Sequence, residues 1–472
     1  MRSVSRAEER RRGGSGPGLR AELSATLALA APLVAGNLAQ MAMSVTTTVM
    51  VGRLGGMPLA AVGLGGMLYF TGGIMLQGVL FAVSPLAAHA LGAGDRGGAG
   101  RIAGAGLALA MMLALPFTAA LAMVDHVLQA LGYDAALAAE IGRYLRAAVW
   151  GVPAFLSYAV LRSVLAALSH TRSIMTVHVL CLAGHAVLSW ALIFGHLGAP
   201  VLGVTGSGYA SAATQWLTLG GLGLCVLLMP GLRGLHLLRA AFAASRNEIG
   251  RILRLGVPIG GMRGIETGLF MTTGVLMGLL GASALAAHQL VLNCAGVTFM
   301  VPLGLANAAT VRVALQLGAD RAAAARRAGF LALALGIAFM SATAIVLWTV
   351  PGAIIGLYIN ASDPANRAIV ATARRLFALA ALFQVFDGVQ VIAAGALRGH
   401  KDAMVPLLLA TIGYWGVGFA GGWLLAFPLG YGAVGLWWGL ALGLAAVAVL
   451  LTLRLNWIAQ PSTDVVAAVA LH

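Results

Sequence analysis

Two acidic residues, Glu266 and Asp387, lie inside long apolar segments from which this sequence otherwise keeps acids away. The chain has only 14 Asp and Glu residues among 472. Others stand near the chain ends or in short polar connections, as do Glu8, Glu9, Glu22, Asp95, Asp320, Asp402 and Asp464. A carboxyl group near the middle of a bilayer costs about 2.5–3.5 kcal/mol on insertion scales, so such residues usually mark a proton, ion or substrate pathway. The alternative is a structural ion pair within a helix bundle.

Arg263 precedes Glu266 by three residues, which places both on the same face of a helix. If they pair, Arg263 holds Glu266 ionised and leaves Asp387 as the better proton carrier. Alternatively, Arg263 points to a different wall of the site. An arginine in mid-segment is costly and seldom lacks a role.

Composition predicts an all-α integral membrane protein. The mean hydropathy is +0.94, 60% of residues are hydrophobic and 9% are charged. Apolar runs of 20 or more residues recur, and each is long enough to cross about 30 Å of hydrocarbon as a helix. We expect about twelve transmembrane helices, with approximate limits 25–51, 58–84, 102–123, 144–168, 174–196, 202–229, 252–280, 284–313, 328–350, 371–397, 404–426 and 432–456.

The net charge of +15 reflects membrane orientation rather than nucleic-acid binding. Arginines gather in the leader and in alternate connections between the expected helices, which is the positive-inside pattern. We therefore expect both termini in the cytoplasm, with an Arg-rich flexible tail over residues 1–24 and a C-terminal tail over residues 457–472. The three cysteines all fall in apolar segments and form no CxxC pair.

An internal repeat predicts the architecture. A shift of 226 residues places Pro32 on Pro258, Thr46 and Thr47 on Thr272 and Thr273, and Leu54-Gly55 on Leu280-Gly281. Each half then holds six helices, so both begin on the same side, like the parallel repeats of some transporters. We expect an N-lobe (helices 1–6) over residues 25–229, a cytoplasmic linker over 230–251 and a C-lobe (helices 7–12) over 252–456. Pro32 and Pro258 are either hinges or static packing kinks.

Several segments resemble the multidrug and toxic compound extrusion (MATE) transporters. They include LAQMAMSVTTTVMVGRLG, SPLAAHALGAGD, LAAHQLVLN and MVPLGLANAATVRVALQLG. The most specific segment, FQVFDGVQVIAAGALRGHKDAMVP, looks like the bacterial NorM-like branch. The resemblance spans nearly all of residues 25–456 in the correct order.

This resemblance implies a two-lobe secondary antiporter that exports amphipathic organic cations, such as drugs, dyes and toxins, in exchange for H⁺ or Na⁺. In the NorM-like branch, acids on the seventh and tenth helices line the C-lobe cavity, and Glu266 and Asp387 match those positions. We expect a monomer in the plasma (inner) membrane, in contact with lipids, that is not an enzyme, needs no cofactor and binds no nucleic acid.

The N-lobe departs from the family pattern. Thr47 stands where the first helix usually carries an aspartate, and His185 and Ser189 replace two asparagines of the fifth helix. Without a carboxylate this lobe is a poor Na⁺ site, so we favour H⁺ as the coupling ion. An unperturbed histidine titrates near physiological pH, so His185 is either a partial replacement for the missing acid or a hydrogen-bonded packing residue.

Six further polar residues in the expected helices are candidates for lining the cavity or for bonding between helices: Gln40, Tyr69, Gln289, Asn293, Gln384 and Gln390.

Three other functional classes fit the sequence less well. A membrane enzyme would need a cluster of reactive residues, and this sequence shows none. A membrane scaffold would leave both buried acids unexplained. A flippase for lipids or lipid-linked precursors is the stronger rival, although its cavity would be expected to be more cationic.

Overall fold

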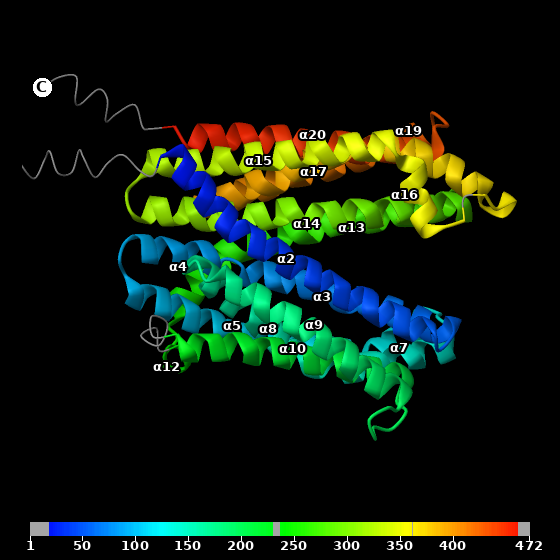
Figure 1. Ribbon diagram of the computed structural model, residues 1–472, viewed down its shortest axis with the longest axis horizontal. Helices are drawn as coiled ribbons and strands as arrows, with labels where there is room; N and C mark the ends of the chain where they lie inside the picture. The colour runs from blue at the N-terminus through cyan, green and yellow to red at the C-terminus, as the bar shows by residue number, and fades with distance from the viewer. Residues whose placement is uncertain (1–17, 230–236, 361, 461–472) are drawn as a thin grey trace, which may run out of the picture. The chain divides into compact units, whose positions relative to one another are not determined.

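A computed structural model describes residues 18–229, 237–360 and 362–460 of the chain (Figure 1). Within these ranges the protein is almost entirely helical and has no strand. The all-α fold class predicted from composition is therefore confirmed.

The first half of the chain contains the helices α2 (Leu19–Gly52), α3 (Gly56–Leu80), α4 (Val83–Gly92), α5 (Arg96–Ala122), α6 (Val124–Ala130), α7 (Ala135–Ala148), η1 (Val149–Gly151), α8 (Val152–Ala167), α9 (Thr171–Phe194) and α10 (Gly203–Leu228). The second half contains α12 (Leu237–Phe242), α13 (Arg246–Leu279), α14 (Ala282–Gly318), α15 (Ala322–Thr349), α16 (Pro351–Tyr358), η2 (Pro364–Asn366), α17 (Arg367–Gly399), α18 (Met404–Thr411), η3 (Ile412–Phe419), α19 (Ala420–Ala426) and α20 (Gly432–Ile458).

Eleven helical segments in the described part of the chain are long and apolar enough to cross a membrane. The twelfth expected span is α13, which has the same 34-residue length as α2 but carries several charges, among them Arg263 and Glu266. The helix that departs from ordinary membrane composition thus presents one of the two candidate acids, Glu266.

The internal repeat reappears in the helix boundaries. Segments Gly56–Gly92 and Ala282–Gly318 both have 37 residues and lie 226 residues apart at each end. Gly55 and Gly281 precede them with φ angles of +118° and +115°. Residues other than glycine rarely adopt this backbone region. The matched Leu-Gly pairs therefore reflect a turn that both halves need.

Two helices begin inside segments that were predicted to be tail or linker. α2 starts at Leu19, within the predicted tail, and α13 starts at Arg246, within the predicted linker. Ser245 and Glu248 explain the second start: the Ser245 hydroxyl accepts from the Glu248 amide (3.3 Å), while the Glu248 carboxylate accepts from the Ser245 amide (3.2 Å). This reciprocal pair is a capping box. The predicted tail residues 1–17 and 461–472, and linker residues 230–236, lie outside the described residues.

By contacts the chain divides into two compact units, Met1–Val34 with Met262–His472, and Ala35–Gly261. The division falls within α2 and α13, shortly after Pro32 and Pro258, which both lie inside continuous helices. The hinge role of these prolines and the predicted lobe limits remain predictions.

The unit that contains the C-terminal half is built around α17, which packs against α14, α15 and α20 (Figure 1). Phe377, Phe383 and Trp437 are among its largest fully buried side chains. In the other unit, α10 packs against α7, α8 and α9.

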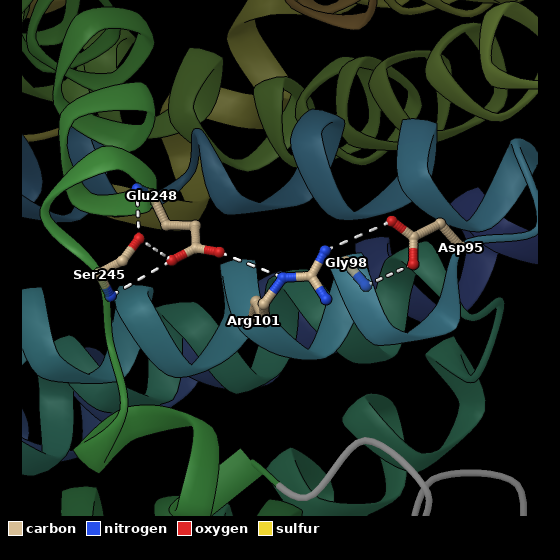
Figure 2. A network of polar contacts seen from close by, with 5 residues as sticks. All are labelled: Asp95, Gly98, Arg101, Ser245 and Glu248. Carbon is tan, nitrogen blue, oxygen red and sulfur yellow. Dashed lines mark hydrogen bonds and ion pairs between the residues drawn. The ribbon is translucent and has the colours of Figure 1, made fainter.

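Two glutamates related by the repeat, Glu22 and Glu248, each pair with an arginine from the other half of the sequence. Glu22 accepts from Arg312 of α14 at 2.9 and 2.5 Å. Glu248 pairs with Arg101 of α5 at 3.2 Å, and Figure 2 shows Arg101 lying between Glu248 and Asp95. Equivalent acids therefore form ion pairs near the starts of α2 and α13. The Glu22 pair is buried, whereas Arg101 in the Glu248 pair is exposed.

A close crossing between α3 and α13 yields a first prediction. A Cβ atom on Gly78 would lie 2.6 Å from the Cα atom of Gly260, so Gly78→Ala requires the helix backbones to separate. We expect a loss of about 1–3 kcal/mol in the free energy of unfolding, measured by thermal denaturation in detergent. Gly63→Ala on the same helix meets nothing within 4 Å and should be neutral or stabilising. Equal melting temperatures for the two variants would contradict the prediction.

Candidate functional site

The two acids identified from the sequence lie in one buried hydrogen-bonded group. Glu266 of α13 and Asp387 of α17 are 8% and 7% exposed. The amide nitrogen Nε2 of Gln390 donates to Glu266 Oε1 at 3.0 Å and to Asp387 Oδ1 at 3.1 Å. Gln390 follows Asp387 by one helical turn, so α17 supplies both an acid and the amide that links the two acids.

Arg263 pairs with Glu266. Its Nη1 atom lies 3.2 Å from Glu266 Oε2, and both side chains are largely buried. Of the two orientations left open by the sequence, the structure therefore has the paired one. Asp387 has no ion pair among the described residues, and its hydrogen bond comes from the neutral amide of Gln390. Among the described residues the group thus contains one acid in an ion pair, Glu266, and one acid outside any ion pair, Asp387.

A second arginine, Arg398, acts electrostatically on the group formed by Arg263, Glu266, Asp387 and Gln390. Arg398, in the last turn of α17, interacts electrostatically with Arg263 and Glu266. Its Nη2 atom is buried and has no hydrogen-bond partner among the described residues. Arg398 follows the expected helix 371–397 by one residue, so the sequence placed it in a connection.

Aromatic rings pack close to the acids along the chain. Phe383, one turn before Asp387, contacts Phe270 of α13 and Trp437 of α20, with ring centroids 6.0 and 5.4 Å apart. Trp415 of η3 donates from Nε1 to the carbonyl of Ile265 at 3.3 Å, directly beside Glu266. Aromatic rings therefore lie within one helical turn of each acid on α13 and α17, and they pack on rings of α20 and are joined by Trp415 of η3.

The predicted N-half residues Thr47, His185 and Ser189 also come together. His185 Nε2 lies 2.9 Å from the Thr47 hydroxyl and 3.4 Å from the Ser189 hydroxyl. His185 Nδ1 lies 2.8 Å from the hydroxyl of Thr214, which also donates to the carbonyl of Ala210. No carboxylate contacts His185 within the described ranges. Thr214 was missed by sequence reasoning, because threonine in an apolar helix commonly bonds to its own backbone.

The other candidate lining residues are dispersed. Gln384 accepts from Thr298 at 3.1 Å and donates to the Met340 carbonyl, which makes it a bond between helices. Gln289 and Asn293 are exposed, and Asn293 donates to the carbonyl of Gln289. Tyr69 packs against the rings of Phe117 and Phe155, and Gln40 is half-buried. Of the six candidates, Gln390 is the one that contacts the acids.

A model of the MatE family matches residues 32–191 and, again, residues 258–424. Together the two matches cover more than half of the chain. This protein belongs to the MATE family. The starts of the two matches are 226 residues apart, which is the period of the internal repeat. Membership makes the chain a transporter and not an enzyme.

Curated relatives of this MATE chain match over almost its full length. It is 44% identical over 444 residues to the "Probable multidrug resistance protein NorM" of Burkholderia mallei, covering 93% of this chain and 94% of that protein. It is 44% identical over 434 residues to the "Multidrug resistance protein NorM" of Burkholderia vietnamiensis, covering 91% and 93%.

Solved structures share the fold of this MATE protein. A eukaryotic MATE transporter superposes with a TM-score of 0.82 at 22% identity, covering 94% of this chain and 98% of that one. A MOP superfamily transporter from Pyrococcus furiosus superposes with a TM-score of 0.81 at 19% identity, covering 93% and 97%. The predicted architecture of two six-helix halves is thereby confirmed.

Proposed function

We propose that this MATE protein is a secondary active antiporter that exports amphipathic organic cations, such as drugs, dyes and toxins, by alternating access. The observation that carries the proposal is the buried pair of Glu266 and Asp387 joined through Gln390. The names of the NorM relatives, which refer to multidrug resistance, support the same substrate class.

The charges in the site suggest different roles for the two acids in binding a cation. Arg263 neutralises Glu266, so Glu266 carries little net attraction for a cation. Asp387 makes no ion pair with any described residue, so a cationic substrate or a proton can neutralise it. The half-buried ring of Phe270, which packs on Phe383 one helical turn before Asp387, suits the apolar body of an amphipathic cation. Export then follows from competition between the substrate and the coupling ion for Asp387.

H⁺ is the coupling ion that this arrangement favours over Na⁺. A proton needs a single carboxyl group that changes its charge, and Asp387 meets that requirement. Sodium prefers several hard oxygen ligands, and the N-half group around His185 contacts no carboxylate within the described ranges. A membrane potential of about 150 mV supplies roughly 3.5 kcal/mol for each charge moved, or about a 300-fold concentration ratio.

The same proposal places the protein in the inner membrane of a bacterium, with both termini in the cytoplasm. The NorM relatives are bacterial, and the alternation of arginine-rich with uncharged connections orients the helices.

A lipid or lipid-linked precursor flippase is the second candidate, because Arg263 and Arg398 give the site two cations beside its two acids. The Pyrococcus furiosus transporter is described as having a "reverse polarity of binding pocket" that "suggests different function", so this fold accommodates more than one function. Dye efflux from drug-sensitised cells that express the chain separates the two. We expect efflux of organic cations; its absence across a broad panel, with lipid translocation present, would favour the flippase.

A further inference from the structure

Tyr414 is a buried polar residue that the proposed mechanism has not used. It lies in η3, an eight-residue π-helical segment between α18 and α19. Its side chain is 0% exposed, and its hydroxyl has no hydrogen-bond partner in the described part of the chain. Leaving a buried hydroxyl unpartnered costs stability, and π-helical segments occur frequently at functional sites. Both features need an explanation beyond packing.

The fold fixes η3 next to the acids. Trp415, the residue after Tyr414, donates to the carbonyl of Ile265, the residue before Glu266. In the same segment, Gly418 approaches α20 so closely that a Cβ atom there would lie 3.3 Å from the Cα atom of Gly443. The Tyr414 hydroxyl interacts electrostatically with Glu266 and Asp387. The unpartnered hydroxyl is therefore held within the field of the acid pair.

Some polar atoms around the acid pair have no hydrogen-bond partner among the described residues. Glu266 receives one donor from Arg263 and one from Gln390, whereas Asp387 receives one donor, from the same amide nitrogen. The other end of that amide, Gln390 Oε1, is buried and accepts no hydrogen bond among the described residues. Among the described residues the site thus contains one free acceptor, Gln390 Oε1, and two free donors, the Tyr414 hydroxyl and Arg398 Nη2. Of the two donors, the Tyr414 hydroxyl is the neutral one.

A carboxyl group that exchanges a proton needs different partners in its two states. The protonated form has an O–H group that requires an acceptor, and the ionised form requires donors. Gln390 Oε1 can accept from the protonated carboxyl, and the Tyr414 hydroxyl can donate to the ionised one.

We propose that Tyr414 is a positioning residue of the acid pair, whose hydroxyl donates a hydrogen bond to the pair when both acids are ionised and loses it when a proton binds. This inference rests on the proposed function and deepens it, because it names the group that stabilises the proton-released state.

The charged groups that act on Tyr414 belong to two helices: Arg263 and Glu266 of α13, and Asp387 of α17. Arg398 of α17 acts on Arg263 and Glu266. Segments α18, η3 and α19 contain no charged residue. The charged residue of α20, Arg454, pairs with Asp402 at 2.9 Å. A pH effect of changing Tyr414 therefore acts on the acid pair.

The test is the pH profile of dye transport by Tyr414→Phe in proteoliposomes. The pH values on both sides are moved together at a constant pH difference. The substitution removes one donor to the ionised pair and leaves the ring, so proton release should require a more alkaline medium. We expect the midpoint to move by about one pH unit, a tenfold change in proton concentration. The melting temperature should be unchanged or higher, because an unpartnered buried hydroxyl is lost.

Tyr431→Phe, at an exposed tyrosine, is the matched control and should leave the profile unchanged. A Tyr414→Phe profile that superimposes on the wild type, or a lower melting temperature with equal loss of rate at every pH, would overturn the assignment. Asp387→Asn in the same assay separates the two proposals. If Asp387→Asn abolishes transport and Tyr414→Phe has no effect, the inference about Tyr414 fails alone. If Asp387→Asn transports normally, the proposed function fails as well.

Discussion

Asp387→Asn is expected to reduce transport to the level of empty vesicles while the protein is still made and inserted. The substitution preserves the shape of the side chain but removes both its charge and its ability to bind and release a proton. Asparagine can still accept from Gln390 Nε2, so the fold should be little affected. Transport of a fluorescent cation, normalised to the amount of protein in the membrane, measures the effect.

Two substitutions sharpen this result. Asp363→Asn makes the same chemical change at an exposed acid and should transport normally. Glu266→Gln leaves Arg263 without its counter-charge, so we expect partial loss. If Asp387→Asn transports normally while Glu266→Gln does not, the two acids have the opposite roles from those proposed.

Arg312→Met is expected to have the largest effect on stability. It leaves the Glu22 carboxylate, which is 1% exposed, without its ion pair at the start of α2. Breaking a buried pair by removing one partner costs about 3–5 kcal/mol in the free energy of unfolding. Thermal denaturation in detergent would record this as a large fall in melting temperature.

The repeat provides a matched control for this prediction. Glu248 occupies the position equivalent to Glu22, but its partner Arg101 has a side chain that is 61% exposed. Exposed pairs contribute about 0–1 kcal/mol, so Arg101→Met should be nearly neutral. The double variant Glu22→Gln with Arg312→Met should recover part of the lost stability. An Arg312→Met protein as stable as the wild type would show that Glu22 finds other partners.

The parts of the fold that could be predicted are those set by local pattern. Apolar run length located the helices, and the shift that aligned Pro32 with Pro258 also aligned Gly55 with Gly281, whose unusual φ angles explain why glycine recurs there. The unfavourable cost of burying a carboxylate was enough to identify Glu266 and Asp387. These inferences need no knowledge of which helices touch.

The parts that could not be predicted depend on contacts between distant segments. Helical spacing placed Arg263 and Glu266 on one face but did not settle whether they pair, because both side chains have several rotamers. The linking role of Gln390 required α13 and α17 to be adjacent. Tyr414 was missed because a tyrosine in an apolar helix resembles any packing aromatic, and no sequence pattern indicated a π-helix.

The most direct test of the central account is dye transport in proteoliposomes with pH and Na⁺ gradients imposed separately and the voltage clamped. Wild-type protein should concentrate the cation when the pH gradient alone is present, and Asp387→Asn should not. Transport driven by a Na⁺ gradient alone, at equal pH, would contradict proton coupling through Asp387.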